Sequence, residues 1–184
     1  MQTLYIHPDN PQARLIGQIC DALNQNEIII CPNDKVYHFV FLSTAKQASE
    51  TINKIQANSD FVLACQSISQ MANFAEIDNE QFRQIKANDG KSAVFRLLAN
   101  KNTPKYLMHP KHKTIDLVMI NQPILQAIAE QAGQLCIVPV LQDNREQVEQ
   151  FSYEIQEKFE KFASFIVHDD NTVSELPMTI DLMD

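Results

Sequence analysis

The sequence predicts an α/β protein whose sheet contains both parallel and antiparallel strands. Short apolar segments alternate with amphipathic segments of helical period along the 184 residues, as expected when helices pack against a sheet. Two apolar segments, Ile28–Cys31 and Val36–Leu42, lie only four residues apart, which favours a hairpin-like antiparallel connection. Hydrophobic residues make up 45% of the chain and charged residues 21%, so wholesale disorder is excluded.

The first half of the chain begins with a short predicted strand and a predicted helix. Asn10 is a good N-cap and Pro11 suits the first turn of a helix. Ser43 or Thr44 is expected to cap the next helix. The predicted elements of this half are the strand Thr3–Ile6, the helix Pro11–Asn24, the strands Ile28–Cys31 and Val36–Leu42, the helix from Ser43 or Thr44 to Ala57, the strand Phe61–Cys65 and the short helices Ile68–Phe74 and Asn79–Ala87.

The second half continues the alternation and ends on strands. Gly133 is well placed to end a helix, because glycine is the favoured residue just past a helix C-terminus. The predicted elements of this half are the strands Ala93–Leu98 and Thr114–Met119, the helix Pro123–Ala132, the strand Cys136–Val140, the long helix Arg145–Phe162 and the strands Phe165–His168 and Thr179–Leu182.

Bulk properties exclude several classes of protein. The longest apolar runs are far too short to span a bilayer, and the N-terminus lacks a basic, then apolar, secretory signal. A cytoplasmic location is therefore the default expectation, with no membrane partner. The chain has only three glycines, which argues against a glycine-rich phosphate loop. A net charge of −8 gives no general support to nucleic-acid binding.

No metal site is predicted. His109 and His112 lie on a loop broken by Pro110, with no neighbouring carboxylate or cysteine, and make a poor ligand set. The segment His168–Asn171 could offer carboxylates to a cation, but a turn at the end of a strand explains it better. The cysteines stand in apolar contexts that predict buried, reduced thiols: Cys20, Cys31, Cys65 and Cys136.

One local segment is basic. Residues 101–113 contain four lysines, two histidines and no acid. A solvated loop is the first interpretation, and a rim that binds phosphate or RNA is the second. The lysines of this candidate patch are Lys101, Lys105, Lys111 and Lys113.

The segment from Glu27 to Tyr37 resembles the entry loop of the YrdC/YciO family, the threonylcarbamoyl-AMP synthases. In that family a proline, a threonine, an acidic residue, two variable residues and an aromatic follow an apolar run. Here they correspond to Pro32, Asn33, Asp34 and Tyr37, with asparagine in place of threonine. Further landmarks occur in the same order, among them an opening like that of the YciO branch (residues 5–15) and Pro177–Leu182 near the end.

The resemblance implies a twisted, open mixed sheet with helices packed against it and a concave cleft that holds the site. It implies one domain over residues 1–184 that lacks the family's usual C-terminal strand and tail. The enzymes join L-threonine, bicarbonate and ATP, so their cleft needs cations or Mg²⁺ for the phosphates and fixed donors for the carboxylates. ATP and Mg²⁺ are therefore expected only if that activity is retained, and no other cofactor is predicted.

At the positions that match this chemistry the sequence departs from the family. Gln56 replaces an arginine, Val118 replaces a second one, and Val138 and Val140 replace hydroxyl residues beside Pro139. Each charge-assisted contact contributes about 1.5–3 kcal/mol, so the loss of four or five would erase a micromolar affinity of about 8 kcal/mol. The remaining candidate cleft residues are Pro32, Asn33, Asp34, Tyr37, Lys54, Lys91 and Thr179.

These observations lead to three functional hypotheses. The first is a non-catalytic relative that keeps a nucleotide-, RNA- or protein-binding role connected with translation or tRNA modification. The second is an active synthase with a rearranged site that uses Lys54, Asp34, Lys91 and Thr179. The third is a double-stranded-RNA-binding module. The lysines of residues 101–113 support this hypothesis, and the net charge does not.

Overall fold

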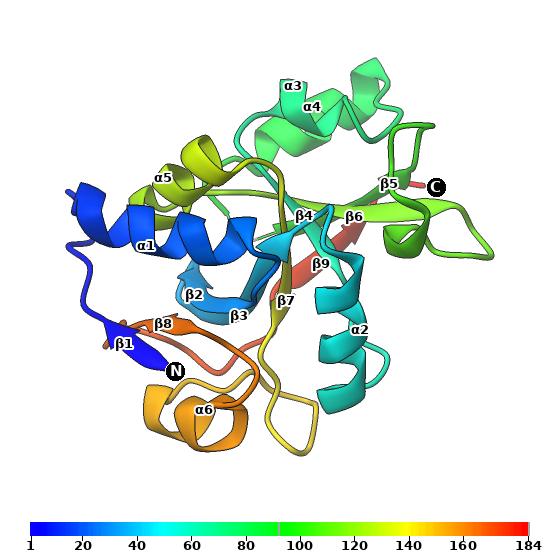
Figure 1. Cartoon of the computed structure of the whole chain (residues 1–184). Helices are drawn as coiled ribbons and strands as arrows, with labels where there is room; N and C mark the ends of the chain where they lie inside the picture. The colour runs from blue at the N-terminus through cyan, green and yellow to red at the C-terminus, as the bar shows by residue number, and fades with distance from the viewer. Residues whose placement is uncertain (92, 184) are drawn as a thin grey trace.

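A single sheet organises the molecule. The computed structural model describes residues 1–91 and 93–183, and nine strands of the described residues form this sheet in the order β1-β8-β2-β3-β7-β4-β6-β5-β9 (Figure 1). The strands are β1 (Gln2–Leu4), β2 (Ile29–Asn33), β3 (Val36–Leu42), β4 (Val62–Cys65), β5 (Ala93–Leu98), β6 (Thr114–Met119), β7 (Leu135–Pro139), β8 (Phe165–Val167) and β9 (Met178–Asp181).

The sheet is mixed, which confirms the predicted class. β2 and β3 form the expected antiparallel hairpin, while β4 with β6 and β5 with β9 are parallel pairs. The central strands β3, β7 and β4 run antiparallel to their neighbours in this group. They are buried on both faces, which explains why their sequences are almost continuously apolar rather than alternating.

Two helices cover one face of the sheet. Helix α1 (Ala13–Asn24) and helix α5 (Pro123–Ala132) pack against each other and against β2 and β3 (Figure 1). Their apolar residues join those of β2, β4, β6 and β7 in one buried cluster. None of the described helices is long and apolar enough to cross a membrane.

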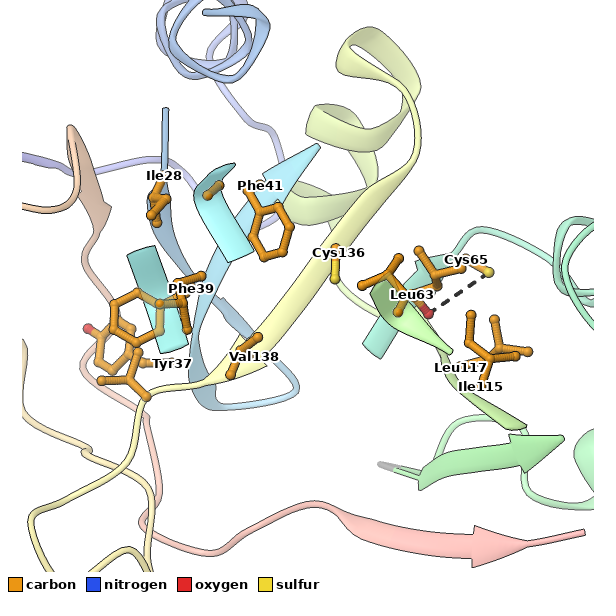
Figure 2. Close-up of a cluster of buried hydrophobic side chains, with 14 of the residues drawn as sticks. Ile28, Tyr37, Phe39, Phe41, Leu63, Cys65, Ile115, Leu117, Cys136 and Val138 are labelled. Atoms are coloured by element: carbon orange, nitrogen blue, oxygen red, sulfur yellow. Dashed lines mark hydrogen bonds between the residues drawn. The ribbon is translucent and has the colours of Figure 1, made fainter. Parts of the chain in front are cut away.

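The opposite face carries the second cluster, which we call the inner cluster. Helices α2 (Lys46–Ile55), α3 (Ile68–Met71), α4 (Asn79–Ala87) and α6 (Ser152–Phe159) and the 3₁₀ turn η1 (Lys105–Leu107) surround it. Figure 2 shows part of this cluster, where aromatic side chains of β3 lie beside residues of β7. Two edge-to-face pairs extend it toward the periphery: Phe39 with Phe159, at 5.1 Å between ring centroids, and Phe41 with Phe61, at 5.9 Å.

The predicted long helix Arg145–Phe162 is wrong in its first half, because α6 begins only at Ser152. The preceding residues form extended pairings instead. Val148 forms a β-bridge with Leu141, and Glu149 N–H donates to the Val140 carbonyl at 2.7 Å. Burial of Val148 against its own upstream strand outweighs the local preference of this charged segment for helix.

Two other predicted helix starts differ from the structure. Helix α1 begins at Ala13 rather than at Pro11, with Gln12 in extended conformation as N-cap. The Gln12 side chain does not cap the helix and accepts a hydrogen bond from His7 N–H. Helix α2 begins at Lys46, and neither Ser43 nor Thr44 caps it. The remaining predicted elements are present with the predicted bounds or with shifts of at most three residues at their ends.

Residues 168–177, the crossing segment, carry the chain from β8 to β9, which is the last strand at the far edge of the sheet. The Tyr37 hydroxyl donates to the Asp169 carbonyl at 3.1 Å and accepts from Asp169 N–H at 3.0 Å. Val173 N–H donates to the Lys35 carbonyl at 2.8 Å. The crossing segment is thereby fastened to the β2–β3 hairpin.

The substitution Tyr37→Phe should loosen this fastening. It removes both hydrogen bonds of the hydroxyl while keeping the ring in the inner cluster, so we expect a loss of about 1–2 kcal/mol in unfolding free energy. Urea unfolding measures the loss, and Tyr153→Phe, at a ring that is 63% exposed, is the matched control. Equal stability of the two variants would contradict the assignment.

Candidate functional site

The segment that resembles the synthase entry loop is a tight hairpin turn. Asn33 pairs in register with Val36 across β2 and β3, which leaves Asp34 and Lys35 as the two turn residues. Both have left-handed backbone angles, with φ of 49° and 67°, the pattern of a type I′ hairpin turn. The geometry of this segment is thus fully explained by the hairpin.

Asn33, which stands where the family has threonine, is enclosed by the fold. Only 4% of the residue is exposed, and its Oδ1 is buried without a hydrogen-bond partner among the described residues. A buried acceptor left unpaired costs roughly 1–3 kcal/mol. The side chain presents neither a hydroxyl nor a charge to a ligand in solution.

Gln56, which stands where the family has arginine, forms hydrogen bonds of the kind that the backbone of a neighbouring strand would form. Its Nε2 donates to the Pro139 carbonyl at 2.9 Å, and its Oε1 accepts from Leu141 N–H at 3.0 Å. These two contacts reproduce the donor and acceptor of a neighbouring peptide group. β4 begins with Val62 opposite Ile137 of β7. The Gln56 amide therefore continues the pairing of β7 past the first residue of β4. Its two polar groups are fully used within the protein.

Replacing Gln56 with alanine should be costly, because it leaves the Pro139 carbonyl and Leu141 N–H unpaired beside a small void. We expect a loss of about 2–4 kcal/mol in unfolding free energy, measured by urea denaturation. Gln47→Ala on the exposed side of α2 is the control, and should change stability by less than about 0.5 kcal/mol. A small effect at both positions would show that the amide contacts are unimportant.

The strand positions that match the nucleotide-binding hydroxyls and the second arginine are buried among apolar side chains. Val138 and Val140 are 1% and 0% exposed in the inner cluster, and Val118 is 6% exposed in the cluster on the other face. Figure 2 shows Val138 beside Phe39 and Tyr37. These positions therefore form core, with no polar group directed at a ligand.

Cys31 and His38 are neighbours across β2 and β3 but do not form a nucleophile–base pair. Cys31 Sγ donates to the Pro32 carbonyl at 3.6 Å, and His38 Nδ1 lies 2.7 Å from the Val36 carbonyl oxygen. Burial raises the pKa of the Cys31 thiol and lowers the pKa of His38 to about 4. All four cysteines are free and buried, which confirms the prediction of structural thiols.

The low pKa of His38 predicts a stability that depends on pH. Between pH 6.5 and about 4 the unfolded chain binds a proton at this histidine that the folded chain does not, so stability falls as the pH decreases. The contribution amounts to roughly 3 kcal/mol by pH 4. Unfolding free energies at pH 7, 6 and 5 should show a shallower slope for His38→Gln than for His112→Gln, an exposed histidine. Identical slopes would rule out the effect.

The other predicted cleft residues lie apart from the hairpin. Lys54 is exposed in the last turn of α2. Lys91 borders a cavity of about 390 Å³ between α4 and β5, and Thr179 is exposed on β9 opposite Val94. Strands β7, β4 and β6 separate the β2–β3 hairpin from β5 and β9, so the structure does not gather the predicted residues into one cavity.

The four lysines of residues 101–113 are exposed on the connection between β5 and β6. In the same connection His109 Nδ1 accepts hydrogen bonds from Lys111 N–H at 3.3 Å and His112 N–H at 3.1 Å, and the two rings stack. Asn171 N–H donates to the Asp169 side chain at 2.8 Å, which makes that segment a turn. Within residues 1–91 and 93–183, no group of three or more metal-ligating side chains is present.

A charged pair that the sequence reasoning missed lies in the middle of β5 and β6, where Arg96 and Asp116 are in register. Arg96 donates two hydrogen bonds to Asp116, at 2.9 and 3.1 Å. Two adjoining cavities of about 460 and 620 Å³ open beside this pair. A signal was present in the sequence, because Arg96 in β5 and Asp116 in β6 are the single charged residues of their strands.

A family model for Sua5, YciO and YrdC proteins, described as "Telomere recombination", matches residues 21–182. The chain belongs to the Sua5/YciO/YrdC family. Uncharacterized protein YciO of Escherichia coli is 32% identical over 187 residues, which cover 100% of this chain and 91% of the relative. An uncharacterized protein of Haemophilus influenzae is 31% identical, over 98% of this chain and 90% of the relative.

Solved structures of the Sua5/YciO/YrdC family share the fold. The crystal structure of E. coli YciO matches with a TM-score of 0.93 over 100% of this chain and 91% of that one. P. abyssi Sua5 in complex with L-threonine matches with a TM-score of 0.86 at 15% identity, over 100% of this chain and 55% of that one; at this identity it shows the fold alone. The predicted family and its twisted mixed sheet are confirmed.

Proposed function

We propose that this protein is a non-catalytic member of the Sua5/YciO/YrdC family, with a binding role connected with translation or tRNA modification. The observation that carries the proposal is the burial of Val138 and Val140 in the inner cluster. In the synthases these strand positions offer hydroxyls to the nucleotide. Here they contribute to a hydrophobic core.

The chemistry of ATP supports the same conclusion. A triphosphate needs several cations, and an adenylate intermediate needs fixed donors in a closed polar pocket. Both polar groups of Gln56 are hydrogen-bonded to backbone, to Pro139 at the end of β7 and to Leu141 just after it, and a neutral amide cannot neutralise phosphate. Lys54 is the basic residue that persists in this part of the family pattern, and it is exposed.

An active synthase with a rearranged site is the less favoured alternative. It would need Asp34, Lys54, Lys91 and Thr179 to act on one substrate. Asp34 belongs to a hairpin turn between β2 and β3, whereas Thr179 lies on the edge strand β9. Four strands, β7, β4, β6 and β5, separate these positions, so a single small substrate would not reach both.

The proposal predicts no threonylcarbamoyl-AMP synthesis. With ATP, L-threonine, bicarbonate and Mg²⁺, pyrophosphate release should equal that of a blank without protein. Calorimetric titration of the protein with ATP and Mg²⁺ should give no binding heat, because the cationic and hydroxyl contacts are missing. An active threonylcarbamoyl-AMP synthase in the same assay is the positive control.

Two outcomes would overturn or redirect the proposal. Pyrophosphate release that depends on L-threonine would establish the active synthase. Binding of double-stranded RNA that weakens steeply with salt, and that is lost when the four lysines of residues 101–113 are changed to glutamine, would establish an RNA-binding module in its place.

A further inference from the structure

We propose that Ser152 is an activated serine that accepts an acyl group from a neutral carboxylic ester, with His168 as its base and Asp170 positioning that base. The site is one of covalent modification and needs no turnover. It therefore goes beyond the proposed binding role without contradicting it. None of these three residues is among the predicted cleft residues.

The three side chains are joined by hydrogen bonds. The Ser152 hydroxyl oxygen lies 3.3 Å from His168 Nδ1, and the Asp170 carboxylate lies 2.7 Å from His168 Nε2. The carboxylate accepts from Nε2–H of the neutral ring, which leaves Nδ1 free to accept the Ser152 proton. A serine is activated when a base that a third group orients lies within reach, and such contacts are often long before a reagent binds.

The fold holds the base in place beside the serine. Helix α6 begins at Ser152 and lies beside β1 and β8 (Figure 1). His168 directly follows β8, and its N–H donates to the Leu4 carbonyl at 2.9 Å. The rings of His168 and Tyr5 are in contact, with 5.1 Å between centroids. The His168 side chain is 25% exposed, so a small reagent can reach it.

The Tyr37 hydroxyl is a second partner for Ser152. Burial raises the pKa of Tyr37 to about 12, and a hydrogen bond with Ser152 is among the smaller effects that lower it. Tyr37 is therefore a neutral phenol, and its oxygen already accepts from Asp169 N–H. Because an imidazole nitrogen is a stronger acceptor than a phenol oxygen, the Ser152 hydrogen is better directed to His168.

The first turn of α6 can stabilise the negative charge that develops on the acyl oxygen. Within residues 1–91 and 93–183, the N–H groups of Tyr153 and Glu154 have no hydrogen-bond acceptor, as is usual at a helix start. In other activated serines at the start of a helix, the N–H of the next residue serves as a donor to the oxyanion. Tyr153 N–H has that position here.

The proposed step transfers one acyl group and one proton. Ser152 Oγ forms a bond to the carbonyl carbon of the ester, and its proton moves to His168 Nδ1. The bond between that carbon and the ester oxygen breaks, and the departing alcohol takes the proton from Nδ1. The products are an acyl-serine and a free alcohol.

The surroundings favour a neutral donor. Residues 149–154 and 165–173 contain four acids and no lysine or arginine, so the local field repels anionic esters. Tyr5, Phe151 and Tyr153 are exposed and offer apolar surface next to His168 and Ser152. An aryl ester of a small acid fits these surroundings.

Acetylation of the full chain by p-nitrophenyl acetate, quenched with acid and mapped by peptide mass spectrometry, tests the site. Ser152 should be acetylated at least about tenfold faster than Ser69, an exposed serine of α3. His168→Gln should slow the reaction of Ser152 about a hundredfold. Asp170→Asn, which removes an exposed partner, should slow it about twofold to fivefold. Diisopropyl fluorophosphate, whose serine adduct is stable, should give the same order.

The matched control is His112→Gln, at an exposed histidine outside the site, which should acetylate Ser152 within about twofold of wild type. Circular dichroism verifies that each variant is folded. Equal acetylation of Ser152 and Ser69, or an unchanged rate in folded His168→Gln, would overturn the proposal and leave a purely structural contact of the crossing segment. A stronger preference for Ser152 over Ser69 with acetylsalicylate, an anionic aryl acetate, would overturn the class of donor. These measurements do not involve ATP, so the two proposals can fail separately.

Discussion

Burial of the central strands on both faces is the constraint on which the rest of the structure depends. β3, β7 and β4 have helices or covering turns on either side, so a polar group on them has no water to bind and must find a partner within the protein. This chain has Val138 at such a position of β7, where the side chain is buried in the inner cluster. Under the proposed function, closing the core and losing the nucleotide site would be one physical change.

The sequence predicted the strands better than it predicted the helix ends or the site. Short apolar runs with turns between them identified the nine strands of the described residues to within two residues at each end, because burial on both faces leaves a strong signal. Residues 145–151 look helical on their own, yet Val148 pairs with Leu141. Gln56 looked like a weakened ligand, and its pairing with β7 depends on contacts 83 to 85 residues away that no local pattern reveals.

The candidate functional site, too, could be predicted from the sequence only in part. The short spacing between two apolar segments located the hairpin correctly, but only the structure shows that Asp34 and Lys35 are a two-residue turn and that Asn33 is enclosed. Conversely, Arg96 and Asp116 are lone charges in apolar strands, and their significance depends on a strand pairing made across the sheet. In this chain the charged pair thus lies toward one edge of the sheet, while the central strands are buried and largely apolar.

The place of β1 in the sheet has a consequence for how the protein folds. Within residues 1–91 and 93–183, β1 pairs with β8 alone, with Gln2 opposite Phe165 and Leu4 opposite Val167. Contacts of such long sequence separation form slowly. We therefore expect the pairing of β1 to be among the last steps of folding.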